Sequence, residues 1–586
     1  MLRLFKNLTK KELLCILISL VLIVCQVWLE LKMPDYMSSI TQLVQTEGSS
    51  MSDILTQGFY MLVCAFGSLL SAIVVGFLAA TTASSFATTL RKILFEKIFR
   101  LSTHEMKKFS VSSLITRTTN DITQVDMIIG MGLQMMAKAP IMAAWAILKI
   151  LDKGFEWSIL TGACVIILLI TVALILIKVL PRFSLVQKLI DNINKITGEN
   201  LLGIRVIRAF NAEEFQTNRF EKVNNDLTSI QMSNQKTFAI MNPMMNLVMH
   251  GLTIGIYTIG TILISNAGMQ DKITLFGNMV VFSSYGMQVI MSFLMLAMIF
   301  MMVPRAMISA KRINEVLDQE ETIESGTFKE ETKEKGTVEF KNVSFKYPDA
   351  DEYLLKDISF KINKGETVAF IGSTGSGKST LINLIPRFYD ATDGEVLIDG
   401  VNVKEYDLEY LYNKLGYVPQ KAVIFDGTVS SNVSYGNNGK KKSKDGIKNA
   451  IKVAQATEFV EKMDKKYDTH IAQGGTNVSG GQKQRLSIAR AIAKEPEIYI
   501  FDDSFSALDL KTDKALRKSL NEETKDATVL IVAQRISTIM NADKIVVLDE
   551  GKVVGCGTHN ELIENCQVYQ EIALSQLSKE ELSNAK

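Results

Sequence analysis

The residues best suited to chemistry form one glycine-rich stretch, which reads Gly-Ser-Thr-Gly-Ser-Gly-Lys-Ser-Thr over positions 372–380. It fits the phosphate-binding pattern G-x-x-x-x-G-K-[ST]. The apolar run 367–371 predicts a strand before it and 381–384 a helix after it. The glycines let backbone N–H groups point at phosphates, and a helix N-terminus adds partial positive charge. We therefore predict a nucleotide-phosphate site made of Gly372, Ser373, Thr374, Gly375, Ser376, Gly377, Lys378, Ser379 and Thr380.

Within this loop, Lys378 is expected to reach the β- and γ-phosphates, and the Ser379 hydroxyl to ligate Mg²⁺. Further along the chain, the apolar strand 498–502 ends in Asp502, a carboxylate typical of the second Mg²⁺-side element of such sites. These residues predict a metal-assisted nucleotide site rather than a simple glycine turn.

Three further features have polar or aromatic groups at positions where they could meet a nucleotide. A glycine-containing turn that opens a helix is a second phosphate-binding arrangement, and its residues are Ser479, Gly480, Gly481 and Gln482. Gln420 follows a strand, where its amide could touch Mg²⁺ or water and also move. Tyr347 either stacks on a base or is a core aromatic of its strand, and the sequence leaves both open.

The composition indicates a protein with a membrane-embedded half. Of 586 residues 47% are hydrophobic, the mean hydropathy is +0.16, and the apolar excess lies in the first half. The formal net charge of +2 does not favour nucleic acid as a partner. The six cysteines form no C-x-x-C pair and are predicted to be buried, reduced thiols.

Spanning a bilayer takes about 20 apolar helical residues. Lys and Arg are frequent at the N-terminus and after the second and fourth apolar stretches, and rare after the first, third and fifth. By the positive-inside rule both termini are then cytoplasmic. The six predicted spans are Leu13–Leu31, Phe59–Ala80, Met127–Ile150, Ser158–Leu180, Phe238–Ile264 and Phe276–Val303.

The two long segments 84–126 and 182–237 keep helical periodicity, so we expect helices that extend beyond the membrane. Their turning points, Leu101–Ser110 and Arg208–Phe215, are predicted to form short contact helices. A solvated amphipathic loop is the alternative for each.

Polar groups inside spans are costly and usually face a cavity or another helix. Asn242, Asn246 and His250 share one face of the fifth span, near an expected kink at Pro243. Lys138 in the third span is predicted either to face a cavity, to pair with a neighbouring helix, or to snorkel. The sixth span carries Gln288 and a methionine stripe, which either lines a cavity or packs in the ordinary way: Met287, Met291, Met295, Met298 and Met302.

A charged connector separates this half from a soluble α/β pattern that begins at Gly336. We predict a transmembrane domain over 1–304, a linker over 305–335, a nucleotide-binding domain over 336–574 and a tail over 575–586. The predicted strands are Val338–Phe340, Thr367–Ile371, Glu395–Ile398, Leu415–Val418, Ile498–Phe501, Val529–Val532 and Lys544–Leu548.

Together these residues resemble the ATP-binding-cassette (ABC) family, over almost the whole chain. In that resemblance 372–380 is the Walker A loop, Asp502 closes Walker B, and Val478–Gln482 stands for the signature motif, here beginning with Val. Gln420 matches the Q-loop glutamine, Tyr347 the adenine-stacking tyrosine, and 506–509 the D-loop. The resemblance implies a six-helix exporter-type transmembrane domain fused to an α/β P-loop nucleotide-binding domain. It also implies ATP and Mg²⁺ as cofactors, with Ser379, Gln420 and Asp502 as ligands of the metal. The two short contact helices would then couple the membrane domain to the nucleotide-binding domains, and the second of them would dock on the partner subunit.

Two positions depart from the family pattern. Asp503 stands where the family has a glutamate that acts as general base, and Gln534 where it has the switch histidine. Aspartate is one methylene shorter, and glutamine cannot carry positive charge at the γ-phosphate. Both changes in one site predict tight ATP binding with weak hydrolysis, whereas the signature core 479–482 is intact. This combination resembles the degenerate-site subunit of heterodimeric bacterial multidrug exporters.

The sequence therefore predicts a multi-pass subunit in the plasma membrane of a bacterium, paired with a non-identical ABC half-transporter. The pair would export small amphipathic or lipophilic compounds, drugs among them, in contact with membrane lipids. Two alternatives stay open: a slow homodimeric lipid or peptide exporter, and an ATP-gated regulator without transport.

Overall fold

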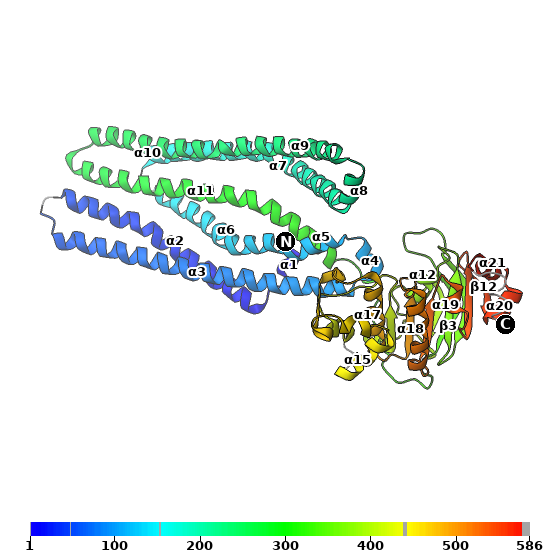
Figure 1. Ribbon diagram of the computed structural model, residues 1–586. Helices are drawn as coiled ribbons and strands as arrows, with labels where there is room; N and C mark the ends of the chain where they lie inside the picture. Colours follow the sequence, from blue (N-terminus) through cyan, green and yellow to red (C-terminus); the bar gives the residue numbers. More distant parts are fainter. Residues whose placement is uncertain (1, 47, 152–153, 437–441, 577–586) are drawn as a thin grey trace. The chain divides into compact units, whose positions relative to one another are not determined.

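The computed structural model describes residues 2–46, 48–151, 154–436 and 442–576 (Figure 1). Most of the predicted tail 575–586 lies outside the described residues. The chain forms two compact units: a membrane unit of Met1–Phe99 and Val111–Gln319, and a nucleotide unit of Arg100–Ser110 and Glu320–Lys586.

The membrane unit consists of long helices, six of which are long and apolar enough to cross a bilayer, as predicted. The longest candidate runs over Glu213–Asn266, which at 1.5 Å per residue is about 80 Å and well beyond a bilayer core. The helices are α1 (Leu2–Phe5), α2 (Lys10–Gln45), α3 (Met51–Arg100), α5 (Val111–Thr116), a π turn (Arg117–Asp121), α6 (Ile122–Leu151), α7 (Phe155–Leu202), α8 (Ile204–Ala209), α9 (Glu213–Ala239), α10 (Met241–Asn266) and α11 (Met269–Leu317).

Both predicted turning points contain a short helix, but the second lies earlier than expected. The first is α4 (Thr103–Lys107), which begins with a capping box between Ser102 and Glu105. The second is α8, at 204–209 rather than 208–215, because Gly203 ends α7 and Asn211 takes a left-handed backbone (φ 50°) that stops the helix. The expected kink at Pro243 appears as a break between α9 and α10 at Ile240. In a continuous helix the proline ring would clash with the carbonyl of Ala239, four residues earlier, and the break lies just after that residue.

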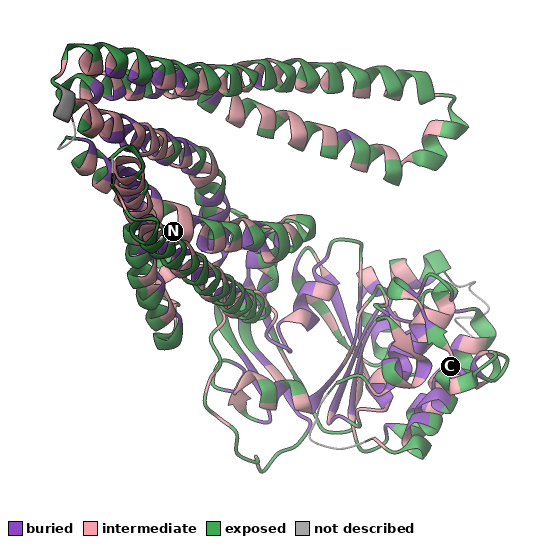
Figure 2. Cartoon of the chain, turned by 90° about the vertical axis from the view of Figure 1, so that its left-hand side faces the viewer, coloured by how far each residue is buried: buried purple, intermediate pink, exposed green. Residues whose placement is uncertain are grey.

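Within the membrane unit, α11 packs against α2, α6 and α10, and α7 packs against α9 and α10 (Figure 1). The buried Trp157 indole of α7 donates to the Ile256 carbonyl of α10 at 3.2 Å. The buried Tyr285 hydroxyl of α11 donates to the Leu31 carbonyl of α2 at 2.8 Å. Polar side chains therefore fix helix pairs whose remaining surfaces are largely exposed (Figure 2).

The nucleotide unit is built on a six-stranded sheet in the order β12-β11-β3-β10-β9-β6 and a four-stranded antiparallel sheet in the order β2-β1-β4-β5. Its strands are β1 (Val338–Phe345), β2 (Leu355–Ile362), β3 (Thr367–Gly372), β4 (Asp393–Ile398), β5 (Val401–Asn402), β6 (Leu415–Val418), β7 (Gly427–Thr428), β8 (His470–Ile471), β9 (Ile498–Asp502), β10 (Thr528–Val532), β11 (Lys544–Asp549) and β12 (Lys552–Gly557). Its helices, besides α4, are α12 (Lys378–Asn383), α13 (Leu408–Lys414), α14 (Val429–Val433), α15 (Lys444–Val453), α16 (Thr457–Glu461), α17 (Gly480–Ile492), α18 (Leu510–Glu523), α19 (Ile536–Ile539), α20 (His559–Asn565) and α21 (Gln567–Gln576).

All seven predicted strands are present, and the α/β fold is confirmed. Sequence reasoning missed the two-residue strands β5, β7 and β8, and also β2 and β12, whose charged and glycine residues dilute the apolar pattern. Strands β3, β10 and β9 are parallel neighbours. Their carboxyl ends therefore meet at one edge, which brings together the residues that follow each strand. Buried residues concentrate along these strands (Figure 2).

A buried ion pair holds α13 to the sheet. The Lys414 ammonium lies 2.8 Å from the fully buried Asp399 carboxylate and 2.9 Å from Glu497. We expect Lys414→Met to lower the free energy of unfolding of the nucleotide unit by about 3 kcal/mol or more, because it leaves Asp399 buried without its cation. Thermal unfolding of the purified chain measures this. The control Lys448→Met, in an exposed pair with Asp445, should change it by less than about 0.5 kcal/mol. Equal effects would contradict the argument.

Candidate nucleotide site and membrane cavity

The glycine-rich loop lies between β3 and α12, and two of its glycines are required by geometry. A Cβ on Gly372 would sit 2.0 Å from the Leu548 carbonyl oxygen, so no side chain fits there. Gly377 has a left-handed backbone (φ 95°), and a Cβ there would lie 2.6 Å from Leu355 Cδ2. The chain thus keeps a curled backbone that opens into the first turn of α12, as phosphate binding needs.

The Lys378 ammonium lies across this loop. Its Nζ donates to the carbonyls of Gly372 at 2.9 Å and Ser373 at 2.7 Å, and to Ser376 Oγ at 3.3 Å. Burial lowers the pKa of Lys378, while the nearby Asp502 and Asp503 carboxylates oppose that shift. A phosphate would offer this cation charged acceptors in place of neutral carbonyls, so the loop fits the predicted ligand.

Ser379 and Asp502 come together as the sequence predicted. Ser379 Oγ donates to Asp502 Oδ1 at 2.8 Å. Burial raises the pKa of Asp502, and the neighbouring Asp503 charge raises it further, whereas the hydrogen bond from Ser379 lowers it in part. A hydroxyl and a carboxylate oxygen at this separation are the hard ligands that Mg²⁺ prefers. The residues therefore fit a magnesium ion that would relieve the charge on Asp502.

Asp503 and Gln534, the two departures, contact one another, and Gln420 joins them. Asp503 Oδ2 accepts from Gln534 Nε2 at 2.8 Å and from Gln420 Nε2 at 3.2 Å. The backbone of Asp503 is left-handed (φ 47°), which is uncommon for a residue other than glycine. Gln420 thus contacts Asp503 rather than Asp502. In this structure two amides occupy one carboxylate oxygen at the position expected for the general base.

Burial raises the pKa of Asp503, opposed by its hydrogen bonds and by Lys378. When the pKa of a carboxyl is higher in the folded chain than in the unfolded chain, its protonated form stabilises the fold. This contribution is fully present below the pKa of the unfolded chain, near pH 4, and is lost as the pH rises through the pKa of the folded chain. We therefore expect Asp503→Asn to leave the thermal midpoint of the nucleotide-free chain unchanged near pH 4. At pH 7.5 it should raise the midpoint, because the buried side chain is then charged in the unaltered chain and neutral in the variant. Differential scanning fluorimetry measures both, with Asp526→Asn as the exposed control. A lower midpoint for Asp503→Asn at pH 7.5 would refute this account.

Tyr347 packs against the aromatic core of its sheet, as one of its two predicted roles requires, and stacking on a base stays a prediction. Its ring packs edge-on against Phe345 and Tyr389, with centroids 5.0 and 5.4 Å away, and its hydroxyl lies 2.8 Å from Thr380 Oγ1 of the loop. The Lys107 ammonium of α4 lies 5.9 Å from the ring centroid. The ring is half-buried. It is therefore a fixed aromatic beside the phosphate loop, suitable for stacking.

The signature turn is formed but stands apart from the loop. Ser479 and Gln482 make a capping box at the start of α17, with Ser479 N–H donating to Gln482 Oε1 at 2.9 Å. Ser479 and Gly480 are exposed. Within the described residues no hydrogen bond joins 479–482 to 372–380. The structure thus does not bring the signature to this chain's own phosphate loop.

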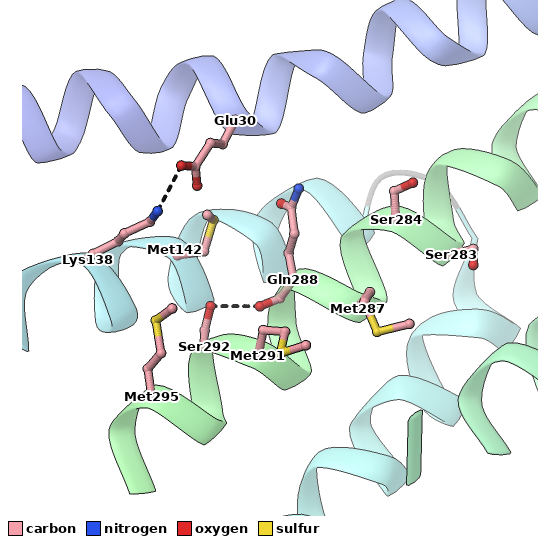
Figure 3. Close-up of a pocket in the computed structure, with 10 residues that line it drawn as sticks. All are labelled: Glu30, Lys138, Met142, Ser283, Ser284, Met287, Gln288, Met291, Ser292 and Met295. Carbon is pink, nitrogen blue, oxygen red and sulfur yellow. Dashed lines mark hydrogen bonds and ion pairs between the residues drawn. The ribbon is translucent and has the colours of Figure 1, made fainter. Parts of the chain in front are cut away.

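The membrane unit holds a cavity of about 520 Å³ between α2, α6 and α11 (Figure 3). The cavity is lined by Gln288 and by three residues of the methionine stripe, Met287, Met291 and Met295, as the first of the two alternatives for the stripe predicts. Met302 lines a second cavity of about 380 Å³. Met298 is 40% exposed and lines neither cavity.

Lys138 both lines the larger cavity and pairs with a neighbouring helix, so it does not snorkel. Its partner is Glu30, 2.8 Å away, which sequence reasoning missed although it is an acidic residue at the end of the first apolar run. Asn242, Asn246 and His250 are exposed in the single chain, so none faces a cavity described here.

Comparisons with known proteins agree with this geometry. The family model of the ABC transporter transmembrane region matches residues 16–293, and the model described as ABC transporter matches residues 355–506. An uncharacterized ABC transporter ATP-binding protein of Mycobacterium tuberculosis is 37% identical over 92% of this chain and 93% of its own length. The ATP-dependent lipid A-core flippase of Pseudomonas aeruginosa is 31% identical over 81% of this chain and 77% of its own length.

Among solved structures, a bacterial Atm1-family ABC exporter with ATP bound superimposes with a TM-score of 0.79. The match covers 97% of this chain and 99% of that one at 24% identity, which supports the shared fold alone. The chain therefore belongs to the ABC transporter family, as a multi-pass protein with one transmembrane region and one nucleotide-binding region.

Proposed function

We propose that this chain is the degenerate-site subunit of a heterodimeric bacterial exporter for amphipathic or lipophilic compounds, drugs among them. It lies in the plasma membrane with both termini in the cytoplasm. It binds ATP at its own Walker elements and supplies Ser479–Gln482 to the partner's competent site.

One observation carries this proposal: the Asp503 carboxylate is bound by two amides. A general base must lie within about 2.6–3.2 Å of the proton that it takes, directly or through one water. Asp503 is one methylene shorter than glutamate, and Gln534 and Gln420 already donate to its Oδ2. Gln534 in turn cannot supply positive charge to the γ-phosphate. These contacts favour a site that holds ATP and cleaves it slowly.

Exposed features of the chain favour a partner subunit. The signature residues Ser479 and Gly480 are exposed, available to nucleotide bound by another subunit. At the tip of the α7–α9 pair, Leu202, Phe210 and Phe215 are 93%, 78% and 68% exposed. Apolar side chains at the end of a solvated helix pair need cover. We propose that this tip docks on the partner's nucleotide unit.

In the proposed mechanism, two nucleotide units close around ATP and the contact helices transmit that motion to the spans. Lys378 and the loop N–H groups hold the triphosphate, and Tyr347 stacks on adenine. Ser379, Asp502 and Gln420 would hold Mg²⁺, which neutralises phosphate charge when bound. Nucleotide shifts the inward–outward equilibrium only by its differential affinity for the closed state.

The test needs both chain types. Native mass spectrometry of the protein purified at its natural abundance should give one copy each of two different half-transporters. Reconstituted into vesicles, that pair should move lipophilic dyes in an ATP-dependent way. A complex of two identical chains would refute the heterodimer, and dye-independent ATPase without flux would favour an ATP-gated regulator.

A second candidate is a homodimeric lipid exporter, favoured by the lipid A-core flippases among the relatives. Burial raises the pKa of Asp503, which brings that carboxyl closer to the range useful for a slow general base. ATP-driven lipid translocation by the purified single chain would favour this candidate.

A further inference from the structure

The Glu30–Lys138 ion pair lies where a membrane protein rarely has charge. Both residues line the cavity between α2, α6 and α11, and Lys138 falls near the middle of the third predicted span (Figure 3). Charge at such depth is costly and is usually retained for a function. Of the ten lining residues, only these two are charged.

The pair is incompletely satisfied. Glu30 Oε1 accepts from Lys138 Nζ at 2.8 Å, Gln26 Nε2 at 2.9 Å and Ser68 Oγ at 3.1 Å. Among the described residues no donor reaches Glu30 Oε2, and Lys138 has one acceptor for its three N–H groups. Both side chains remain partly open, at 18% and 22% exposure.

A third polar group of the cavity also lacks a partner. Gln288 Oε1 on α11 is buried, and no donor among the described residues reaches it. Figure 3 draws the Gln288 amide directed toward the space beside Glu30 and Met142. A buried acceptor without a partner is expensive. The cavity therefore offers both free acceptors and free donors near one point.

The remaining wall suits an apolar chain. Met142, Met287, Met291 and Met295 surround the polar groups. Methionine side chains adapt to many ligand shapes. The volume of about 520 Å³ lies within the range of small-molecule sites.

From this arrangement we infer that the cavity binds zwitterionic amphiphiles, whose ammonium and acidic groups pair with Glu30 and Lys138 respectively. A ligand with a single charge meets attraction from one member of the pair and repulsion from the other at similar distance, so the two largely cancel. A ligand with both charges gains two charge-assisted contacts. This inference rests on the proposed export function and names the substrate class.

An alternative role for the pair is to join α2 to α6. The chain contains a matched pair for comparison: Asp35 and Lys149, 2.9 Å apart, join the same two helices and do not line the cavity. Neutralising each pair separates helix joining from ligand recognition.

The experiment measures equilibrium binding to the full-length chain in nanodiscs, without ATP or partner. Four probes share a dodecyl chain and differ in head group: phosphocholine, trimethylammonium, phosphate and maltoside. We expect the phosphocholine probe to bind about tenfold more tightly than the other three, because only its head group combines a hydrogen bond from Lys138 to the phosphate with an ion pair between the quaternary ammonium, which has no N–H to donate, and Glu30. Equal affinities, or a preference for a singly charged head, would overturn the inference.

Variants of the pair then locate the preference. Glu30→Gln with Lys138→Met should abolish it, and the exchange Glu30→Lys with Lys138→Glu should retain it, because both charges are still presented. The control Asp35→Asn with Lys149→Met should also retain it. If the preference survives neutralisation of Glu30 and Lys138, the inference is wrong. Should a variant fail to fold, the four-probe comparison on the unaltered chain still decides.

Two further arms separate outcomes. If a two-chain lipid is the natural ligand, phosphatidylethanolamine in the nanodisc should compete with the phosphocholine probe, whereas phosphatidylglycerol should not. Equal binding of the phosphocholine probe in the two kinds of nanodisc identifies a single-chain ligand. ATP-driven dye transport with no phosphocholine preference would refute this inference alone. Phosphocholine preference without any ATP-driven transport would refute the proposed export function alone.

Discussion

Replacing Asp503 by Glu together with Gln534 by His should raise the ATPase rate of the chain purified without its partner on the order of 10²-fold, once two copies pair so that each supplies the signature to the other's site. A positioned general base contributes on the order of 10²–10⁴-fold. The added methylene carries the carboxylate beyond the position where the Gln420 and Gln534 amides donate to Asp503 Oδ2. The histidine removes one of those donors and can carry a proton near the γ-phosphate. Steady-state phosphate release measures the change.

Controls make this result specific to the site. Gln534→His alone should have little effect, because Asp503 remains too short. Adding Lys378→Ala to the double variant should abolish the gain, since Lys378 lies across the phosphate loop. If the unaltered chain already turns over ATP within about threefold of the double variant, a difference of under 1 kcal/mol in barrier, the degenerate-site proposal fails.

The chemistry of the nucleotide unit was largely predictable from sequence because its motifs are local. The glycines of 372–377 require a particular backbone, and the apolar strand before Asp502 fixes where that carboxylate points. The parallel order of β3, β10 and β9 then brings Lys378, Asp502 and Gln534 to one sheet edge. The contact of Gln420 with Asp503 was not predictable, because it depends on the loop after β6 and not on residue type.

The membrane unit was less predictable beyond the existence of its helices. Hydropathy locates spans, but nearly every span residue is apolar, so the pattern does not say which face meets which neighbour. Glu30 illustrates this: its role appears only when α2 is placed beside α6 and Lys138. The methionine stripe likewise divides between two cavities and an exposed face, which periodicity alone could not separate. The shift of α8 relative to the prediction follows from Gly203 and Asn211, backbone effects that hydropathy does not report.

The second large effect concerns Gly480, whose position makes it a probe of the partner's site. A Cβ added at Gly480 meets nothing within 4 Å in this chain, whereas at Gly481 it would lie 3.3 Å from the Ala507 carbonyl oxygen. Gly480→Asp should therefore leave the fold of the isolated chain intact. It is exposed, at the first turn of α17. Any functional loss then reports on something outside the chain.

In the complex with its partner, we expect Gly480→Asp to reduce ATPase and transport on the order of 10²–10³-fold. The new carboxylate would repel the γ-phosphate of the partner's nucleotide and offset the helix N-terminus that should stabilise this phosphate. The expected loss of rate is as large as that caused by removing one positioned hydrogen-bond donor. Binding of a fluorescent ATP analogue to the isolated chain should be unchanged, because that nucleotide lies on Lys378 and Ser379. ATPase of the reconstituted pair and analogue titration of the single chain measure the two halves of this prediction.

A matched control uses the same chemical change in another first turn. Gly446→Asp places an acid at the start of α15, where only the Ser443 hydroxyl lies close, and it should leave both measurements unchanged. Reduced analogue binding in the isolated Gly480→Asp chain would mean that the signature serves this chain's own nucleotide. Undiminished ATPase in the complex would mean that the signature of this chain contacts neither its own nucleotide nor that of the partner. Either result removes the trans arrangement on which the heterodimer depends, because a signature that does not reach the partner cannot complete the partner's site.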